Sequence, residues 1–125
     1  MDSQHNLQTQ FKQGFIALQK REFALAKEAF ENVLNLDPDC KEAFYHLGEI
    51  AQAEKNFPQA IRHYEKVLTY DDEIQEVYNN LGNICLEEGE TTMAIDFLFK
   101  ALAINPDFAL AHHNIGLVFC KEGQL

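Results

Sequence analysis

Four glycines recur along this chain at a constant interval of 34 residues. They are Gly14, Gly48, Gly82 and Gly116. Self-similarity at a fixed period of this size marks a stacked repeat, in which neighbouring copies share one continuous core. A solenoid of this kind presents an extended surface. The spacing therefore predicts a repeat protein whose function is to hold a partner rather than to transform a substrate.

Other residue types keep the same interval. Ala26, Ala60 and Ala94 are also 34 residues apart, and Pro38 and Pro106 are separated by two such steps. Placing each glycine at position eight of its copy divides the chain into a tail at 1–6, three copies at 7–40, 41–74 and 75–108, and an incomplete fourth copy at 109–125.

Each copy contains two amphipathic helical patterns separated by a short polar break. In the second copy, Phe44, Leu47 and Ile50 are three residues apart along the chain, and period-two alternation is absent. The predicted fold is all-α, with about seven antiparallel helices. We expect first helices at 7–20, 41–54, 75–88 and 109–121, and second helices at 23–36, 57–70 and 91–104.

The repeated glycine needs a physical reason, because glycine inside a helix costs about 1 kcal/mol relative to alanine. Close approach of the two helices of a copy supplies that reason. We expect Ala60 to face Gly48 from the paired helix. Gly89, after Glu88, is expected to end its helix, since glycine readily adopts the backbone conformation found there.

Charge and composition exclude several classes of function. The chain has 20 acidic residues against 10 lysines and arginines, a formal charge of -10, which disfavours a nucleic-acid partner. Its apolar runs are too short to insert into a membrane, and its polar N-terminus has no signal core, so a cytoplasmic location is expected. The cysteines Cys40, Cys85 and Cys120 are far apart and never spaced CxxC, which favours reduced thiols.

The residue pattern gives no support for catalysis, a metal or a cofactor. Glu42, His46 and Glu49 share a helix face, but a zinc site needs further closing ligands, and the next histidine on that side is His113, two copies away. The chain has a single serine and no arrangement of nucleophile and base. We therefore expect no enzyme activity.

The motif residues resemble the tetratricopeptide repeat, whose 34-residue signature is W-x2-L-G-x2-Y, then A-x3-F, then P. The second copy matches at Phe44, Leu47, Gly48, Ala60 and Tyr64, and the third copy matches at Tyr78, Leu81, Gly82, Ala94 and Pro106. The resemblance covers residues 7–125 and implies a right-handed α–α superhelix. It also implies a protein-interaction scaffold that binds an extended peptide or a partner helix in a concave groove lined by the first helices.

Carried onto this sequence, the family's groove positions select fourteen residues. The implied peptide-binding residues are Phe11, Lys12, Phe15, Glu42, Tyr45, His46, Glu49, Glu76, Asn79, Asn80, Asn83, His113, Asn114 and Leu117.

Two known uses of such grooves can be weighed against these residues. A clamp for a terminal carboxylate is rejected, because Tyr45, Glu49 and Leu110 stand where lysine, asparagine and lysine are required. The stretch around Asn79, Asn80 and Asn83 is similar to the asparagine-ladder repeats of O-GlcNAc transferases and bacterial tetratricopeptide proteins. Side-chain amides both donate and accept hydrogen bonds, which suits a peptide backbone. The acidic groove favours a neutral or mildly basic peptide.

Two alternatives to a free scaffold stay open. In the first, the chain is the N-terminal substrate-recognition arm of a larger enzyme, of the glycosyltransferase or methyltransferase type. In the second, it is a self-assembly module. In the second case a homodimer forms through the C-terminal face, because the fourth copy lacks its second helix and leaves apolar residues bare. The residues expected on that face are Gly116, Val118 and Phe119.

Overall fold

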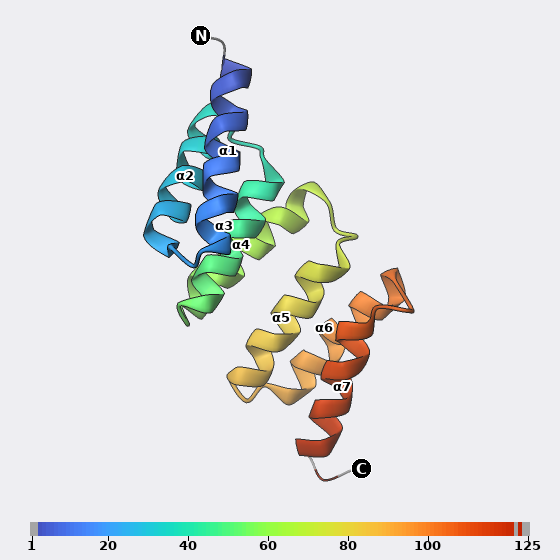
Figure 1. Ribbon diagram of the computed structural model, residues 1–125. Helices are drawn as coiled ribbons and strands as arrows, with labels where there is room; N and C mark the ends of the chain where they lie inside the picture. The colour runs from blue at the N-terminus through green and yellow to red at the C-terminus, as the bar shows by residue number, and fades with distance from the viewer. Residues whose placement is uncertain (1–2, 122, 124–125) are drawn as a thin grey trace. The chain divides into compact units, whose positions relative to one another are not determined.

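The computed structural model describes residues 3–121 and 123, and over these residues the chain is all-α (Figure 1). The helices are α1 (Ser3–Gln19), α2 (Phe23–Leu36), α3 (Lys41–Ala53), α4 (Phe57–Tyr70), α5 (Gln75–Glu87), α6 (Thr91–Ile104) and α7 (Ala109–Lys121). The helix α1 begins at Ser3, so residues 3–6, which the sequence analysis placed in a tail, are helical. No proline or glycine precedes Gly14, so nothing in this stretch opposes a helix.

The helices pack in antiparallel pairs, α1 with α2, α3 with α4, and α5 with α6 (Figure 1). The chain forms two compact units, residues 1–70 and residues 71–125. We call them unit 1, which contains α1 to α4, and unit 2, which contains α5 to α7.

A large side chain from the paired helix packs over the repeated glycine in each complete copy. A Cβ atom on Gly48 would lie 2.6 Å from the ring of Tyr64, and one on Gly14 would lie 2.9 Å from the ring of Phe30. In unit 2, Leu98 approaches Gly82 in the same way, at 3.0 Å. At Gly48 the three nearest atoms all belong to the ring of Tyr64, four residues after Ala60, so the tyrosine makes the closest contact.

The turn inside each copy contains a residue with a left-handed backbone. These residues are again 34 apart: Arg21, Lys55, Gly89 and Gly123 have φ angles of 57°, 63°, 79° and 72°. Only glycine adopts this conformation without a steric cost. Gly89 therefore ends α5 as the sequence predicts, and two copies make the same turn with a long basic side chain.

A second repeated contact joins the two helices of each complete copy. In the first copy Asn32 Nδ2 donates to Gln10 Oε1 at 3.2 Å. In the second, Lys66 Nζ lies 5.9 Å from the centroid of the Phe44 ring, and in the third, Lys100 Nζ lies 5.8 Å from that of Tyr78. An amide pair thus takes the place that cation–π contacts hold in the next two copies.

The core of unit 2 includes part of the helix that was expected to be bare. Val118 is 1% exposed and packs with Leu98, Ala101 and Ala111. Its assignment to a self-association face is therefore wrong, since the side chain points into the unit. Among the described residues, no helix has both the length and the apolar character needed to cross a membrane.

Candidate functional site

The predicted groove residues lie on two helix faces. In unit 1 they lie on α1 and α3, which we call the α1–α3 face, and in unit 2 on α5 and α7, the α5–α7 face. Exposed members are Lys12, Phe15, Glu42, Glu76, His113 and Leu117. Half-buried members are Phe11, Tyr45, His46, Glu49, Asn80 and Asn83, and buried ones are Asn79 and Asn114.

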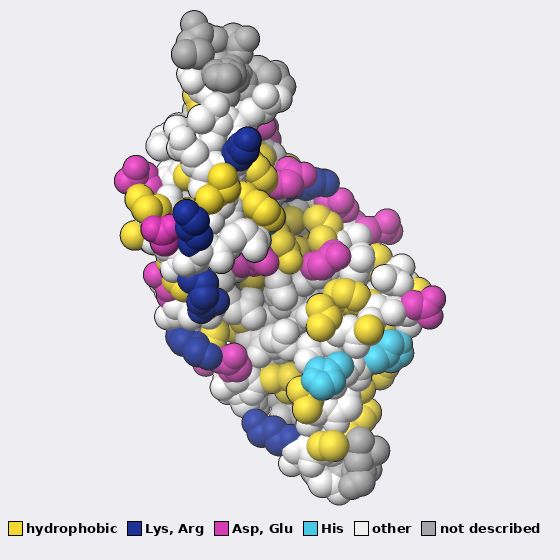
Figure 2. All heavy atoms as spheres, in the orientation of Figure 1, with side chains coloured by type: hydrophobic (Ala, Val, Ile, Leu, Met, Phe, Trp, Pro, Cys, Tyr) yellow, Lys and Arg dark blue, Asp and Glu magenta, His cyan; other side chains and the backbone are white. Residues whose placement is uncertain are grey.

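An aromatic cluster around His46 forms the centre of the α1–α3 face. The imidazole stacks on Phe30, with ring centroids 5.0 Å apart. The edges of Phe11 and Phe15 approach it at 5.7 and 6.0 Å, and Tyr45 does so at 5.5 Å. Figure 2 shows hydrophobic side chains at the surface in this part of unit 1. The ring of Phe15 thus contacts the edge of this cluster, while the residue is 45% exposed.

Glu49 places a carboxylate beside this cluster. Its Oε1 lies 2.7 Å from Nδ1 of His46, one helical turn earlier on α3. The histidine side chain is 16% exposed and the glutamate side chain 36% exposed, so the carboxylate is the part of the pair that solvent or a ligand can reach.

Two cavities open between residues of α1 and α3, and each also has a wall residue from α2. Cavity A has a volume of about 370 Å³, and cavity B one of about 360 Å³. Cavity A is lined by Leu7, Gln8, Phe11, Lys12, Val33, Cys40 and Glu42. Cavity B is lined by Phe15, Leu18, Gln19, Arg21, Phe23, His46, Glu49 and Ala53.

Cys40 contributes an uncharged side chain to the wall of cavity A. Burial and the nearby carboxylates of Glu42 and Asp37 raise the pKa of this thiol above its ordinary value, although backbone hydrogen bonds act in the opposite direction. The thiol therefore stays protonated at neutral pH, and it behaves as a small apolar group.

In unit 2, two of the predicted ligand-binding amides bond to each other. Asn114 Nδ2 donates to Asn79 Oδ1 at 2.9 Å, and these residues are only 8% and 3% exposed. The expectation that both amides face a ligand is corrected, because the bond connects α7 to α5 inside the unit. Asn80 and Asn83 are half-buried and stay on the α5–α7 face with Glu76.

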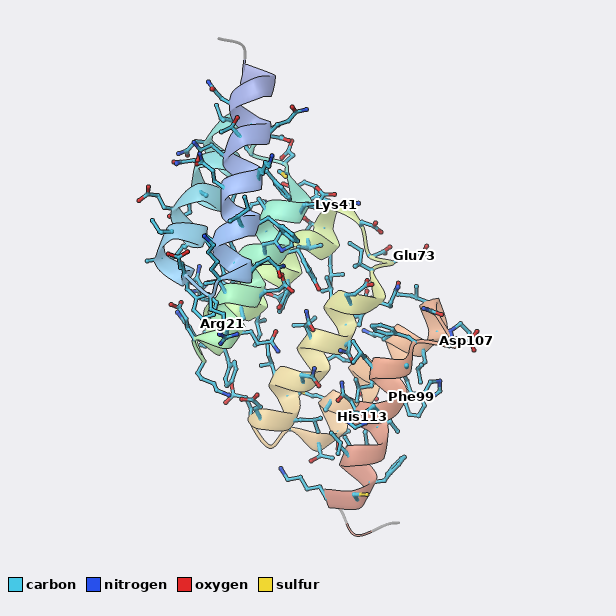
Figure 3. The ribbon with its side chains drawn as sticks, in the orientation of Figure 1. Arg21, Lys41, Glu73, Phe99, Asp107 and His113 are labelled. Atoms are coloured by element: carbon cyan, nitrogen blue, oxygen red, sulfur yellow. The ribbon has the colours of Figure 1, made fainter. Side chains whose placement is uncertain are left out.

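Exposed side chains of α7 complete the α5–α7 face. Leu110 is 56% exposed and Leu117 is 51% exposed. His113 is exposed on the same helix, where Figure 3 labels it. Gly116 is open as well, since a Cβ atom there would meet nothing within 4 Å, and Phe119 is half-buried.

Formal charge is distributed unevenly between the units. Unit 1 has ten acidic and eight basic residues, and unit 2 has ten acidic residues against Lys100 and Lys121. The formal charges are therefore -2 and -8. Within the described part of the chain, no group of three or more His, Cys, Asp or Glu side chains is arranged to hold a metal ion.

Sequence reasoning missed several residues that line the cavities, among them Leu7, Cys40 and Arg21. Leu7 and Cys40 lie at the ends of the first copy, where the repeat pattern gives no groove position, and Arg21 lies in a turn. The guanidinium of Arg21 lies 4.9 Å from the centroid of the Phe23 ring, and Figure 3 shows this residue at the turn after α1. The 34-residue recurrence of the turn position was the available signal for Arg21.

The chain is similar in sequence and fold to known proteins. Three family models described as tetratricopeptide repeat match residues 11–57, 43–76 and 76–108. A search of curated proteins found no match. A crystal structure of MamA superposes with a TM-score of 0.80 at 28% identity, covering 95% of this chain and 65% of that one.

Two further structures are similar in fold. The Yersinia enterocolitica type III secretion chaperone SycD, in complex with a peptide of the translocator YopD, gives a TM-score of 0.84 at 20% identity, with 93% of this chain and 94% of that one covered. A Thermobaculum terrenum O-GlcNAc transferase mutant gives 0.86 at 22% identity, with 95% of this chain and 23% of that one covered. The chain thus spans less than two thirds of the MamA and transferase structures.

Proposed function

Because this chain belongs to the tetratricopeptide repeat family, we propose that it is a non-catalytic interaction module that binds an extended peptide or a partner helix. Each unit offers a binding surface of its own, the α1–α3 face in unit 1 and the α5–α7 face in unit 2. The single observation that carries the proposal is the combination of an exposed aromatic ring, Phe15, with two cavities on the same face. Rigid aromatic groups next to cavities are the usual anchors of protein interfaces.

The chemistry of the two faces favours a neutral or mildly basic ligand. The formal charge of the chain is -10, and Glu42, Glu49 and Glu76 lie among the proposed contact residues. Asn80 and Asn83 add amides on the α5–α7 face that suit a peptide backbone. The similar fold of SycD in its peptide complex supports a peptide as the ligand class.

A pair of phenylalanine variants tests the proposal. Peptides are first selected on the immobilised protein from a phage-displayed library of random nonapeptides, and the enriched sequences are synthesised with a fluorescent label. Their dissociation constants are then measured by fluorescence anisotropy with Phe15→Ala and with Phe99→Ala. The two side chains are 45% and 52% exposed, but Phe15 lies on the α1–α3 face and Phe99 on α6.

We expect Phe15→Ala to weaken binding by about tenfold, the effect of losing an interface anchor worth more than 1 kcal/mol. Phe99→Ala should leave the dissociation constant unchanged. The reverse order of effects, or a library without enriched peptides, contradicts the proposal.

The similarity to an O-GlcNAc transferase favours a second candidate, in which this module is the substrate-recognition arm of a larger enzyme. Sequencing the gene beyond the codon for the last residue tests it. A reading frame that continues into a glycosyltransferase or methyltransferase domain supports the arm, and a stop codon at that point contradicts it. The peptide-binding faces are the same under both candidates.

A further inference from the structure

Cavities A and B differ in chemistry although residues of α1, α2 and α3 line both of them. Five residues in the wall of cavity A are uncharged: Leu7, Phe11, Val33 and Cys40, together with the polar Gln8. Its charged residues are one cation and one anion, Lys12 and Glu42. An apolar side chain is the occupant that suits such a wall, because burying it against these groups removes apolar surface from water.

Cavity B combines aromatic rings with a reachable carboxylate. The exposed ring of Phe15 and the imidazole of His46 both line it, and Oε1 of Glu49 lies 2.7 Å from Nδ1 of that imidazole. A basic side chain can lie against an aromatic face while it pairs with a carboxylate. Arg21 also lines cavity B, with its guanidinium over Phe23, and its charge opposes a basic occupant.

The distance between the cavities sets the spacing of the two occupants. Leu7 and Phe11 of α1 line cavity A, whereas Phe15 and Leu18 line cavity B. The shift of about seven helical residues corresponds to about 10 Å along the axis, at a rise of 1.5 Å per residue. An extended peptide advances by about 3.3 Å per residue, so about three or four residues span this distance.

We propose that the α1–α3 face reads two side chains of its peptide, an apolar one in cavity A and a lysine or arginine in cavity B, three or four residues apart. This inference rests on the proposed function, and it specifies what unit 1 selects. Because Glu49 and Arg21 carry opposite charges, removing them should change the affinity for the basic side chain in opposite directions. Neutralising Glu49 weakens its binding, and neutralising Arg21 strengthens it.

The test repeats the nonapeptide selection on variants of the two cavities. Cys40→Leu narrows cavity A, and Gln8→Trp occupies it from its exposed rim if the first variant folds poorly. Glu49→Gln removes the charge in cavity B and keeps an oxygen for His46. Matched controls are Cys120→Leu, an exposed cysteine on α7, and Glu65→Gln, an exposed glutamate on α4.

On the wild type we expect enriched peptides to carry Leu, Ile, Met or Phe three or four residues from Lys or Arg. Narrowing or occupying cavity A should remove the apolar preference, Glu49→Gln should remove the basic preference, and both controls should keep both preferences. For a synthetic peptide of the enriched sequence, we expect about tenfold weaker binding to Glu49→Gln and tighter binding to Arg21→Ala.

Two results overturn the inference in different ways. Enriched peptides without this pair, or a pair that persists on the narrowed and neutralised variants, show that the cavities do not select the ligand, and the proposed function is retained. The absence of any enriched peptide on the wild type removes the proposed function and the inference together.

Discussion

At the scale of single residues, the four repeated glycines differ in what lies over them. The ring of Tyr64 leaves no room for a Cβ atom on Gly48, and this ring is fully buried with its hydroxyl donating to Gln52 Oε1 at 2.7 Å. Because the ring is buried and its hydroxyl is hydrogen-bonded, moving it aside to make room for a Cβ atom would cost free energy. Gly116 lies in an equally helical segment with open space above it.

We therefore predict opposite effects of the same substitution. Gly48→Ala should destabilise the protein by about 1–3 kcal/mol through overpacking. Gly116→Ala should be neutral or stabilise it by up to about 1 kcal/mol, because alanine is the better helix former. Urea unfolding measures both free energies. Equal effects of the two variants would mean that the ring does not confine Gly48.

His63 in α4 gives a residue-scale prediction that depends on pH. Burial, together with the cations Arg62 and Lys27, holds the pKa of this imidazole below its ordinary value, while Glu31 acts in the opposite direction. As pH falls through about 6.5, the unfolded chain takes up the proton before the folded one does. The free energy of unfolding therefore decreases as the pH falls through this range. Above this range, His63 does not make the free energy of unfolding depend on pH.

His63→Phe should remove this contribution. The ring stays against Phe44, whose centroid is 6.2 Å from that of the imidazole, and Phe97 already occupies the equivalent position one repeat later. Unfolding free energies measured at about pH 7.5 and about pH 5.5, on either side of the ordinary pKa, should differ less in the variant than in the wild type. An identical pH dependence in both proteins rules out a contribution from His63.

At the scale of helices, the Asn79–Asn114 bond connects α5 to α7. Its members are buried, so removing one leaves the other amide without its partner at a cost of about 1–3 kcal/mol. We predict that Asn79→Ala destabilises unit 2 by this amount and that Asn79→Leu with Asn114→Leu costs less than the two single changes added together.

Asn83→Ala is the matched control, since this residue is half-buried on the same helix. It should change thermal stability little while it weakens binding of a selected peptide. If Asn79→Ala left the unfolding temperature unchanged, the buried bond would have no structural role.

The comparison of these helices with the sequence indicates what a repeat pattern can predict. The 34-residue period located the helices, because the contacts inside a copy recur in every copy. The Asn79–Asn114 bond was not predictable, because its residues lie at neighbouring, non-equivalent positions of two copies. The ring over Gly48 was overlooked although Phe30, Tyr64 and Leu98 keep the same period. Cavity A was missed because Leu7 and Cys40 lie at the ends of a copy, outside the groove positions.

At the scale of the whole molecule, self-association through α7 is an expectation separate from peptide binding. Gly116 is open, Leu117 is 51% exposed and Phe119 is half-buried on α7, so this helix offers an apolar surface to a second copy. We predict that Phe119→Glu lowers the molar mass measured by light scattering to that of one 14.3 kDa chain. A wild-type protein that already has this mass contradicts self-association, and Leu25→Glu on α2 serves as the surface control.

The most direct test of a module that binds peptides through its first helices is an NMR titration. Isotope-labelled protein is titrated with a peptide selected on the wild type, and backbone amide shifts are followed residue by residue. The account predicts the largest shifts in α1 and α3 and in α5 and α7, around Phe15, Glu49 and Asn83. Saturable shifts confined to α2, α4 and α6 would contradict it.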